Sequence, residues 1–374
     1  MEGRIVCQRC RQKFSASTNL ETVICPYCHM INPNRTFTNQ SSSLEHGRIS
    51  YPFIDNIMKE KQKLKKILRC SRQKPAASGS SSTKYPKLCA FDYSGPWPKK
   101  RAVLCGVSYK KWKYRLKGTI NDVFNMKQLL IQNYEFKEEN ILVLTEEQTD
   151  PRLIPTKANI EISLKWLVNN CQAGDSLVFY YSGHGLRQPD FENDERDGFD
   201  ETICPVDFLK EGMILDNDIY ATIVKPLTVG VTLHAIVDAC HSGTILDLEH
   251  VYDKEKNKWI DNSPPSGVRK LTSGGKAYCI SACEDDQAAA DTSAFSSKSM
   301  NGAMTVTLID IVRSRPSITY GELLDEMEER IHQVNIEGCL GSRILSRIFG
   351  PNLTQKPLLS ASEEFDIYQR KFRL

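Results

Sequence analysis

The stretch LHAIVDAC, residues 233–240, runs from an apolar segment directly into a reactive thiol. An upstream stretch, LVFYYSGHG at residues 177–185, has the same form and carries an imidazole near its end. Short runs of branched and aromatic residues that end in small residues predict buried β-strands. If the two strands are adjacent and parallel, His184 and Cys240 lie side by side at their carboxyl ends, where open α/β sheets form their active sites.

His184 and Cys240 are the candidate catalytic pair. A neighbouring imidazole increases the thiolate population or takes the proton during attack. Taken alone, a cysteine at a strand end is usually a small buried side chain, and a histidine in a glycine-rich turn is usually structural. Together, with the histidine 56 residues before the cysteine, they follow the order and approximate spacing found in caspases, which favours catalysis. The backbone N–H groups of Gly185 and Cys240 are the candidate oxyanion donors.

Two other histidines lie close to this pair in the sequence. His241 is a rival base, but consecutive side chains of an extended segment point apart, so we expect it to point away from the thiol. His234 lies within the predicted strand, and we expect it to be structural.

From residue 97 onward, strand patterns alternate with helix patterns. Further strands are predicted at residues 102–109, 140–145 and 276–281. Helices are predicted at residues 119–134, 156–171, 303–313 and 319–334, with Thr156 as the N-cap of the second. This alternation implies an α/β fold with a mostly parallel central sheet flanked by helices.

Several motifs together resemble the metacaspases, caspase-like cysteine peptidases of plants, fungi and protists. The two signatures are YYSGHG at 180–185 and DACHSG at 238–243. Further matching segments are LCGVSY (104–109), GTINDV (118–123), DGFDET (197–202), SACEDDQ (281–287), NGAMT (301–305) and EFDIY (364–368). The resemblance covers about residues 97–374. It implies a caspase-like three-layer fold and a dyad of His184 and Cys240 without a third member.

Asp238 is the candidate determinant of substrate specificity. It lies two residues before Cys240, so both side chains face the same way in an extended segment. A carboxylate there repels an acidic substrate side chain and attracts arginine or lysine. The resemblance implies that Asp122 and Ser182 complete this S1 pocket and that cleavage follows Arg or Lys. The alternative is that Asp238 only caps the following turn.

Acidic residues concentrate in the segment 190–201 and recur further along the chain. Clustered carboxylate and amide oxygens suit calcium, a hard cation with roughly six to eight oxygen ligands. No EF-hand spacing is present, so the ligands would converge from separate loops; the alternative is a solvated acidic loop. The resemblance implies calcium activation and assigns the site to Asp200, Asp216, Asn217 and Asp247. Asn217 stands where an acid is common in the family, which predicts weaker affinity.

Residues 1–32 contain two CxxC pairs, Cys7 with Cys10 and Cys25 with Cys28, separated by 14 residues. Four thiolates complete a tetrahedral Zn²⁺ site, and metal binding would supply much of the folding free energy of so short a segment. Redox-active dithiols are the alternative. The segment resembles the zinc finger of plant lesion-simulating-disease proteins, although the usual glycine between the pairs is absent. Few basic residues lie there, so we expect the finger to bind proteins rather than nucleic acid.

The sequence divides into three parts. Residues 33–95 predict a flexible linker, or prodomain, because they are polar, serine-rich and locally basic. Residues 96–374 form the predicted peptidase domain, with a larger part at 96–250 and a smaller part at 276–374. Between them, residues 251–275 contain two prolines, several glycines and several lysines, which predicts an exposed loop open to proteolytic nicking and autoprocessing.

Composition limits the class of protein. The net charge is +3, too small to indicate a nucleic-acid or membrane partner by itself. No apolar stretch approaches about 18 residues and the N-terminus lacks a signal-peptide core, so we expect neither a membrane span nor secretion. Thirteen cysteines, several at metal-like spacing, favour a reducing compartment, which predicts a cytoplasmic or nuclear location.

The sequence therefore predicts a cysteine endopeptidase whose partners are protein substrates, and the resemblance implies that it is calcium-stimulated and cleaves after Arg or Lys at P1. The resemblance implies a monomer with a role in programmed cell death or proteostasis. The alternative is a regulatory protein whose finger and linker recruit partners and whose peptidase activity is low. The presence of His184, Cys240 and Asp238 together favours the enzyme.

Overall fold

The computed structural model describes most of the chain after residue 96 and a few short strands before it. The described residues are 97–112, 114–190, 195–196, 198–239, 242–282, 301–338 and 356–374, with the backbone of 2–6, 13–17, 22–24, 31–33 and 291–292. The chain divides into two compact units, Met1–Ala77 and Ser78–Leu374. Cys240, His241 and the four cysteines of the predicted finger lie outside the described residues.

The N-terminal unit contains two short antiparallel strand pairs. β1 (Glu2–Val6) pairs with β2 (Lys13–Ser17), and β3 (Thr22–Ile24) pairs with β4 (Ile31–Pro33). In the sequence, each CxxC falls between the two strands of one pair. The zinc site and the predicted linker lie outside the described residues, so both stay predictions.

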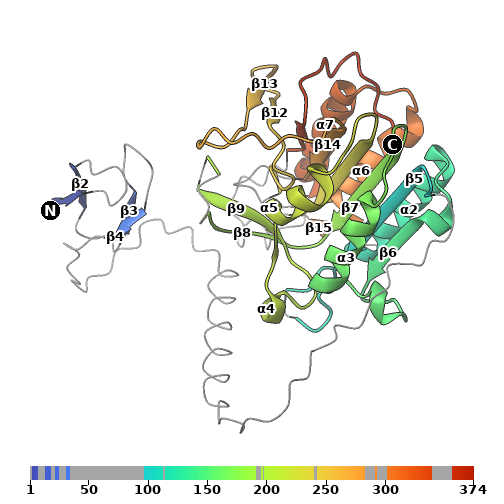
Figure 1. The fold of residues 1–374 in the computed structure, drawn as a ribbon, viewed down its shortest axis with the longest axis horizontal. Helices are drawn as coiled ribbons and strands as arrows, with labels where there is room; N and C mark the ends of the chain where they lie inside the picture. The colour runs from blue at the N-terminus through green and yellow to red at the C-terminus, as the bar shows by residue number, and fades with distance from the viewer. Residues whose placement is uncertain are drawn as a thin grey trace, which may run out of the picture. The chain divides into compact units, whose positions relative to one another are not determined.

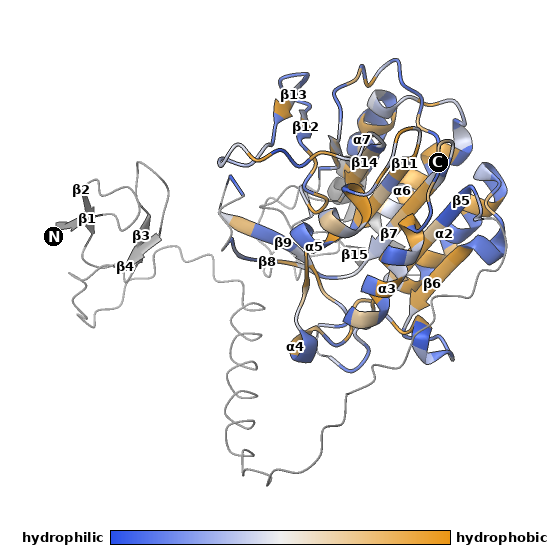
Figure 2. Cartoon of the chain, viewed as in Figure 1, coloured by the Kyte–Doolittle hydropathy of each residue, from blue (hydrophilic) through white to orange (hydrophobic). Residues whose placement is uncertain are grey.

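The second unit is built on an eight-stranded sheet in the order β13-β12-β17-β14-β11-β7-β5-β6 (Figure 1). Five neighbouring strands are parallel: β6 (Ile141–Thr145), β5 (Lys100–Gly106), β7 (Ser176–Ser182), β11 (Thr232–Asp238) and β14 (Lys276–Ser281). Almost all their residues are buried, as expected for a parallel sheet covered on both faces, and most are hydrophobic (Figure 2). The predicted mostly parallel sheet is confirmed.

Helices cover both faces of this sheet. α2 (Thr119–Tyr134), α6 (Ala303–Ser314) and α7 (Tyr320–Gly338) share one apolar core with alternate strand residues such as Leu104, Tyr180 and Ile236. α3 (Lys157–Val168) packs against β5 and β7 together with the π-helical turn η3 (Tyr220–Val224). Thr156 Oγ1 accepts the N–H of Asn159 at 3.3 Å, which confirms the predicted N-cap of α3. The three-layer α/β prediction is confirmed.

A small antiparallel sheet, β10-β9-β8, extends beyond β7 and was not predicted from the sequence. It comprises β8 (Gly185–Pro189), β9 (Phe199–Ile203) and β10 (Ile214–Leu215). The remaining short elements are η1 (Glu138–Asn140), η2 (Pro151–Leu153), α4 (Phe208–Glu211), α5 (Asp216–Ile219), β15 (Asp291–Thr292) and β16 (Asn301–Gly302). Among the described helices, none has the length and apolar character that crossing a bilayer requires.

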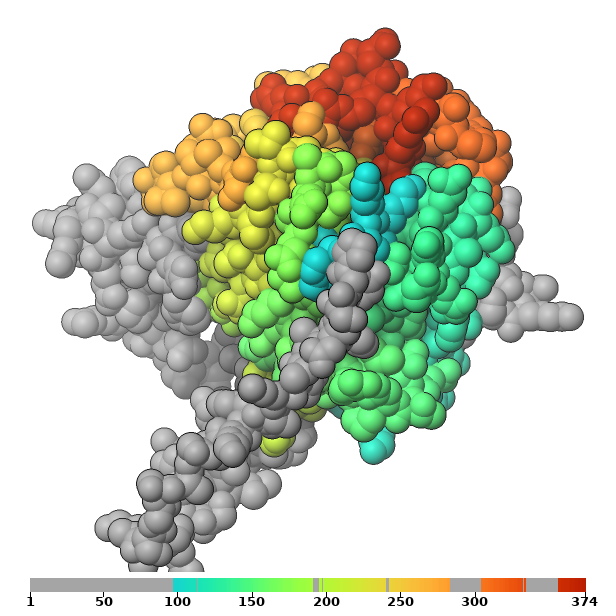
Figure 3. All heavy atoms as spheres, turned by 45° about the vertical axis from the view of Figure 1, so that its right-hand side comes forward, coloured from blue at the N-terminus to red at the C-terminus, as the bar shows by residue number. Residues whose placement is uncertain are grey.

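The prediction of an exposed loop at residues 251–275 is partly wrong, because the first half of this segment forms a β-hairpin. β12 (His250–Asp253) and β13 (Lys258–Asp261) pair with each other, and β12 joins the sheet through β17 (Leu358–Ala361). Trp259 anchors the hairpin, since its indole N–H donates to the Phe365 carbonyl at 2.8 Å. The anchor comes from the C-terminal segment 356–374, which contains the sheet strand β17 and is partly exposed on the face shown in Figure 3. A contact so distant in sequence left no local signal.

Candidate active site and cation cluster

His184 lies between β7 and β8 with its ring held on several sides. The ring centroid is 4.6 Å from that of Tyr109 and 5.8 Å from that of Trp112. Its Nε2 lies 2.7 Å from the carbonyl oxygen of Tyr114. A carbonyl only accepts hydrogen bonds, so Nε2 carries the proton in the neutral ring and Nδ1 is the basic nitrogen.

The backbone of His184 is fixed by the same neighbourhood. Its N–H donates to the Tyr109 hydroxyl at 3.0 Å, and its carbonyl accepts from the Tyr181 hydroxyl and the Cys204 N–H, both at 3.0 Å. Burial lowers the pKa of His184 to about 4, although its hydrogen bond to Tyr114 acts in the opposite direction. The ring is therefore neutral at pH 7 and held in one tautomer.

Glu146 organises the loop that contacts His184, a role that sequence reasoning missed. Its Oε2 accepts the N–H and hydroxyl of Ser108, both at 2.6 Å, and the N–H of Tyr109 at 2.7 Å. Its Oε1 accepts the N–H of Lys110 at 3.1 Å. Tyr109 has φ of 52°, a left-handed conformation that is rare for aromatic residues and needs such support. The available signal was an acid placed directly after the apolar strand ILVLT, residues 141–145.

β7 and β11 are adjacent and parallel, as predicted, and their register pairs Ser182 with Asp238. His184 and Cys240 each follow these partners by two residues in the sequence. Because Cys240 lies outside the described residues, its pairing with His184 stays a prediction.

Gly185, one of the two predicted oxyanion donors, is the first residue of β8. Gly185 is opposite Ile203 in the pairing of β8 with β9. The residue before this strand, His184, is opposite Cys204, and the Cys204 N–H donates to the His184 carbonyl. Hydrogen-bonded and non-bonded pairs alternate along antiparallel strands, so the Gly185 N–H points away from β9. β8 is the edge strand of this sheet, so that N–H lies on its outer side.

The three predicted S1 residues come together at the carboxyl edge of the sheet. Asp122, Ser182 and Asp238 are 0%, 2% and 6% exposed, and the Ser182 hydroxyl donates to Asp122 Oδ2 at 3.4 Å. Asp238 Oδ2 accepts the N–H of Thr305 at 3.1 Å and its hydroxyl at 2.6 Å. Asp238 therefore caps the first turn of α6, a partner 67 residues away that sequence reasoning missed.

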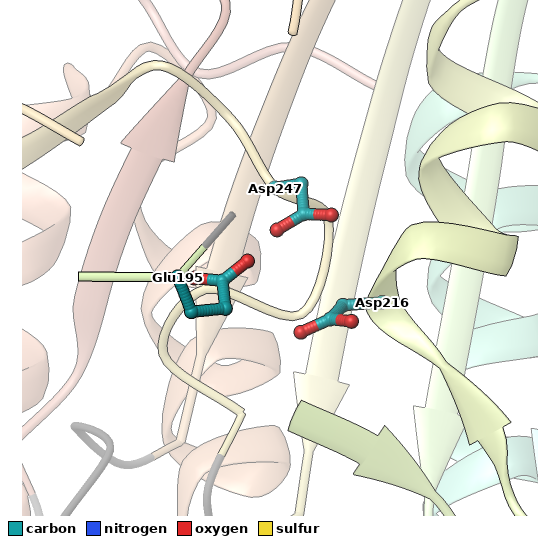
Figure 4. A group of neighbouring side chains, drawn as sticks. All are labelled: Glu195, Asp216 and Asp247. Atoms are coloured by element: carbon teal, nitrogen blue, oxygen red, sulfur yellow. The ribbon is translucent and has the colours of Figure 1, made fainter. Parts of the chain in front are cut away.

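A cluster of carboxylates lies beside this edge (Figure 4). Oxygens of Glu195, Asp216 and Asp247 all lie within 4.8 Å of one another. Asp216 and Asp247 were predicted calcium ligands, whereas Glu195 was only part of the acidic segment 190–201. Asp200 is not in this group, and its Oδ2 accepts from the Gln188 amide at 3.0 Å. Asn217 contacts the cluster indirectly: the Lys270 ammonium lies 3.0 Å from Asn217 Oδ1.

Comparison with known proteins identifies the family of the chain. The family model "Metacaspase, peptidase C14 domain" matches residues 100–249. Metacaspase-1 of Arabidopsis thaliana is 47% identical over 292 residues, covering 75% of this chain and 80% of the relative. Metacaspase-2 of the same plant is 44% identical over 303 residues, covering 74% and 72%. The chain belongs to the metacaspase family. It is a cysteine peptidase.

Solved structures similar to this metacaspase include Caspase-1 from Spodoptera frugiperda. The TM-score is 0.44 at 9% sequence identity, covering 74% of the metacaspase and 89% of that chain.

The acidic cluster of the metacaspase fits a hard divalent cation. Burial and then the neighbouring carboxylates raise the pKa of Asp216 to about 11 and that of Glu195 to about 10. The group therefore needs positive charge to ionise fully. Its donors are all oxygens, and two oxygens bound to one calcium are at most about 5 Å apart, since each bond is about 2.3–2.6 Å. Asp216, Asp247 and Glu195 would hold such an ion.

Proposed function

We propose that this metacaspase is a calcium-stimulated endopeptidase that cleaves proteins after Arg or Lys through a dyad of His184 and Cys240. The observation that carries the proposal is the register pairing of Ser182 with Asp238, beside a neutral and oriented His184. Because of this register, each residue of the proposed dyad follows its paired strand residue by two positions, on two adjacent strands. The same edge of the sheet holds the acids suited to a basic P1 residue.

In the proposed reaction, Cys240 attacks the carbonyl carbon of the scissile peptide bond as its thiol proton passes to Nδ1 of His184. The tetrahedral intermediate collapses to a thioester as the same proton passes to the leaving amine. Water then hydrolyses the thioester, and the thiol is restored. The bond from Nε2 to the Tyr114 carbonyl supports this role, because it presents Nδ1 as the acceptor and stabilises the imidazolium. Gly185 N–H is the proposed oxyanion donor.

Specificity for Arg or Lys is supported by Asp122 and Asp238. Both carboxylates are buried in the same small region, where charge interactions are stronger than in water. An arginine or lysine at P1 brings the compensating charge, whereas an acidic P1 residue adds repulsion.

Calcium stimulation is supported by the convergence of Glu195, Asp216 and Asp247 from three separate segments. When bound, the ion would supply charge that holds these segments together. Asp247 follows Cys240 by seven residues, and the Thr244 hydroxyl between them donates to Glu201 Oε2 at 2.6 Å. The short connection suggests how calcium binding would influence the nucleophile segment.

The N-terminal unit is proposed to bind one structural zinc through Cys7, Cys10, Cys25 and Cys28. The paired strands that flank each CxxC support a compact finger. We propose that this finger binds protein partners, that the enzyme is a monomer, and that it acts in the cytoplasm or nucleus. By resemblance, its role lies in programmed cell death or proteostasis.

The test is hydrolysis of matched fluorogenic peptides that differ only in Arg, Lys or Asp at P1, with and without calcium. Activity on Arg and Lys that requires calcium and disappears in Cys240→Ala would support the whole proposal. Cleavage after Asp would refute the specificity. A folded protein that is inactive under every condition would favour the rival function, a regulatory protein that recruits partners.

A further inference from the structure

The ammonium of Lys270 lies inside the carboxylate cluster. Its Nζ is 2.7 Å from Asp247 Oδ2, 3.2 Å from Glu195 Oε1 and 3.0 Å from Asn217 Oδ1. The Lys270 side chain is only 9% exposed, which is unusual for a lysine in a surface segment. A positive group of this chain therefore already neutralises part of the proposed cation site.

Lys270 and calcium would compete for the same oxygens. A calcium ion bound to Asp247 and Glu195 lies about 2.3–2.6 Å from each carboxylate oxygen. The ammonium is at hydrogen-bonding distance from those oxygens, so the two cations would overlap or repel each other strongly. One ammonium also brings a single charge to three carboxylates, whereas calcium brings two charges and accepts more ligands.

We infer that Lys270 is a tethered competitor for the calcium site, and that calcium binding expels its ammonium and loosens residues 268–272. This inference rests on the proposed calcium dependence and adds the element of the chain that responds to the ion. The affinity measured for calcium is then reduced by the fraction of molecules in which Lys270 occupies the site.

The segment around Lys270 suits such a release. Val268 and Leu271 on either side are 64% and 48% exposed, so little apolar packing holds the segment. Arg269 pairs with Glu249, and the Tyr220 hydroxyl donates to the Leu271 carbonyl at 2.9 Å. These contacts keep the segment close to the site after the ammonium leaves. The movement is therefore local and reversible.

The first test measures calcium affinity by isothermal titration on full-length protein carrying Cys240→Ala, which prevents self-digestion. Lys270→Met in this background should bind calcium about tenfold more tightly or better, because no ammonium has to leave. Lys276→Met is the matched control, since Lys276 pairs with Glu363 on the surface and should leave the affinity unchanged. Equal or weaker calcium binding by Lys270→Met would overturn the inference while leaving calcium binding itself intact.

The second test uses the native lysine, so it does not depend on how the variant folds. Amine acetylation followed by mass spectrometry should label Lys270 slowly without calcium and several-fold faster with it. Lys276, 47% exposed at its side chain, should react at the same rate in both conditions. Unchanged labelling of Lys270 at saturating calcium would overturn the inference. Absence of calcium binding in both the parent and Lys270→Met would overturn the inference and the calcium proposal together.

Discussion

Ser182 and Asp238 are partners in the parallel register of β7 and β11, so the two strands end at the same level of the sheet. The Gly183 N–H donates to the Asp238 carbonyl at 3.3 Å just beyond the ladder. A slip of one residue would turn each of these side chains to the other face of the sheet. One register thus positions Ser182 and Asp238, two of the three predicted S1 residues, and the starting points of the two segments of the proposed dyad.

Replacing Asp238 with asparagine should remove the charge from S1 while keeping the shape of the side chain. We expect kcat/KM for Arg peptides to fall roughly 30- to 1000-fold, because a buried charge pair with P1 is lost. This corresponds to a loss of about 2–4 kcal/mol of transition-state stabilisation. Peptides with a neutral P1 residue should lose much less. The measurement is kcat/KM on a series of P1 peptides.

Asp238 also caps α6, so the effect on the helix must be separated from the effect on substrate. Thr305→Val removes the hydroxyl that donates to Asp238 and leaves its carboxylate charged. This variant should lose about 1 kcal/mol of stability and keep its preference for Arg over neutral P1. An equal loss of preference in both variants would contradict the charge argument.

Glu146→Gln should impair catalysis without changing substrate binding. The carboxylate holds Ser108, Tyr109 and Lys110, and this loop presents the Tyr114 carbonyl to His184. An amide has one acceptor oxygen instead of two, so the loop loses part of its support. We expect kcat to fall about tenfold or more with KM nearly constant, because the effect is on orientation.

The adjacent Glu147→Gln is the matched control, since Glu147 makes only a surface ion pair with Lys110 at half-exposed side chains. The acid limb of the pH–rate profile should move in Glu146→Gln and stay in place in Glu147→Gln. A proportional loss of folded protein with unchanged kcat per folded molecule would show a purely structural role.

Stability should fall as the pH is lowered from 7 toward 4. Burial lowers the pKa of His234 to about 3, against about 6.5 in an unfolded chain. Between these values the unfolded state binds a proton that the native state does not, so acidification favours unfolding. His184, with a pKa of about 4, acts in the same direction.

Urea denaturation at several pH values measures this dependence. His234→Gln replaces the ring that bonds to the Tyr320 hydroxyl at 2.6 Å with a group that does not titrate. For this variant, the free energy of unfolding should change less steeply with pH than for the parent, by up to about 1.4 kcal/mol per pH unit. Parallel curves for the two proteins would show that His234 does not contribute.

The full-length protein should contain one zinc per chain, measured by elemental analysis. Cys25→Ser should lower the zinc content to near zero, because three thiolates bind far more weakly than four. Cys171→Ser, a half-buried free cysteine of the peptidase unit, should keep the metal. Full zinc content in Cys25→Ser would contradict the proposed ligand set.

The local sequence was sufficient for most individual elements of the peptidase unit. α2 begins and ends at the residues that periodicity predicts, and the core strands were located within a few residues. Buried strands and amphipathic helices carry their signal in their own residues, so local patterns predict them. The small sheet β10-β9-β8 escaped prediction because its strands are short, at most five residues, and carry no long apolar run. The hairpin β12–β13 escaped prediction because its anchor lies near the C-terminus.

The sequence by itself determined which reactive side chains this protein carries: a histidine and a cysteine after two apolar strands, acids predicted to suit basic substrates, and acids predicted to suit a cation. Only the tertiary structure decided which partners these residues meet. Glu195 joins Asp216 and Asp247, Thr305 binds Asp238, and Lys270 enters the carboxylate cluster. Such contacts join residues far apart in the chain. They depend on register, burial and charge in three dimensions, which no local pattern encodes.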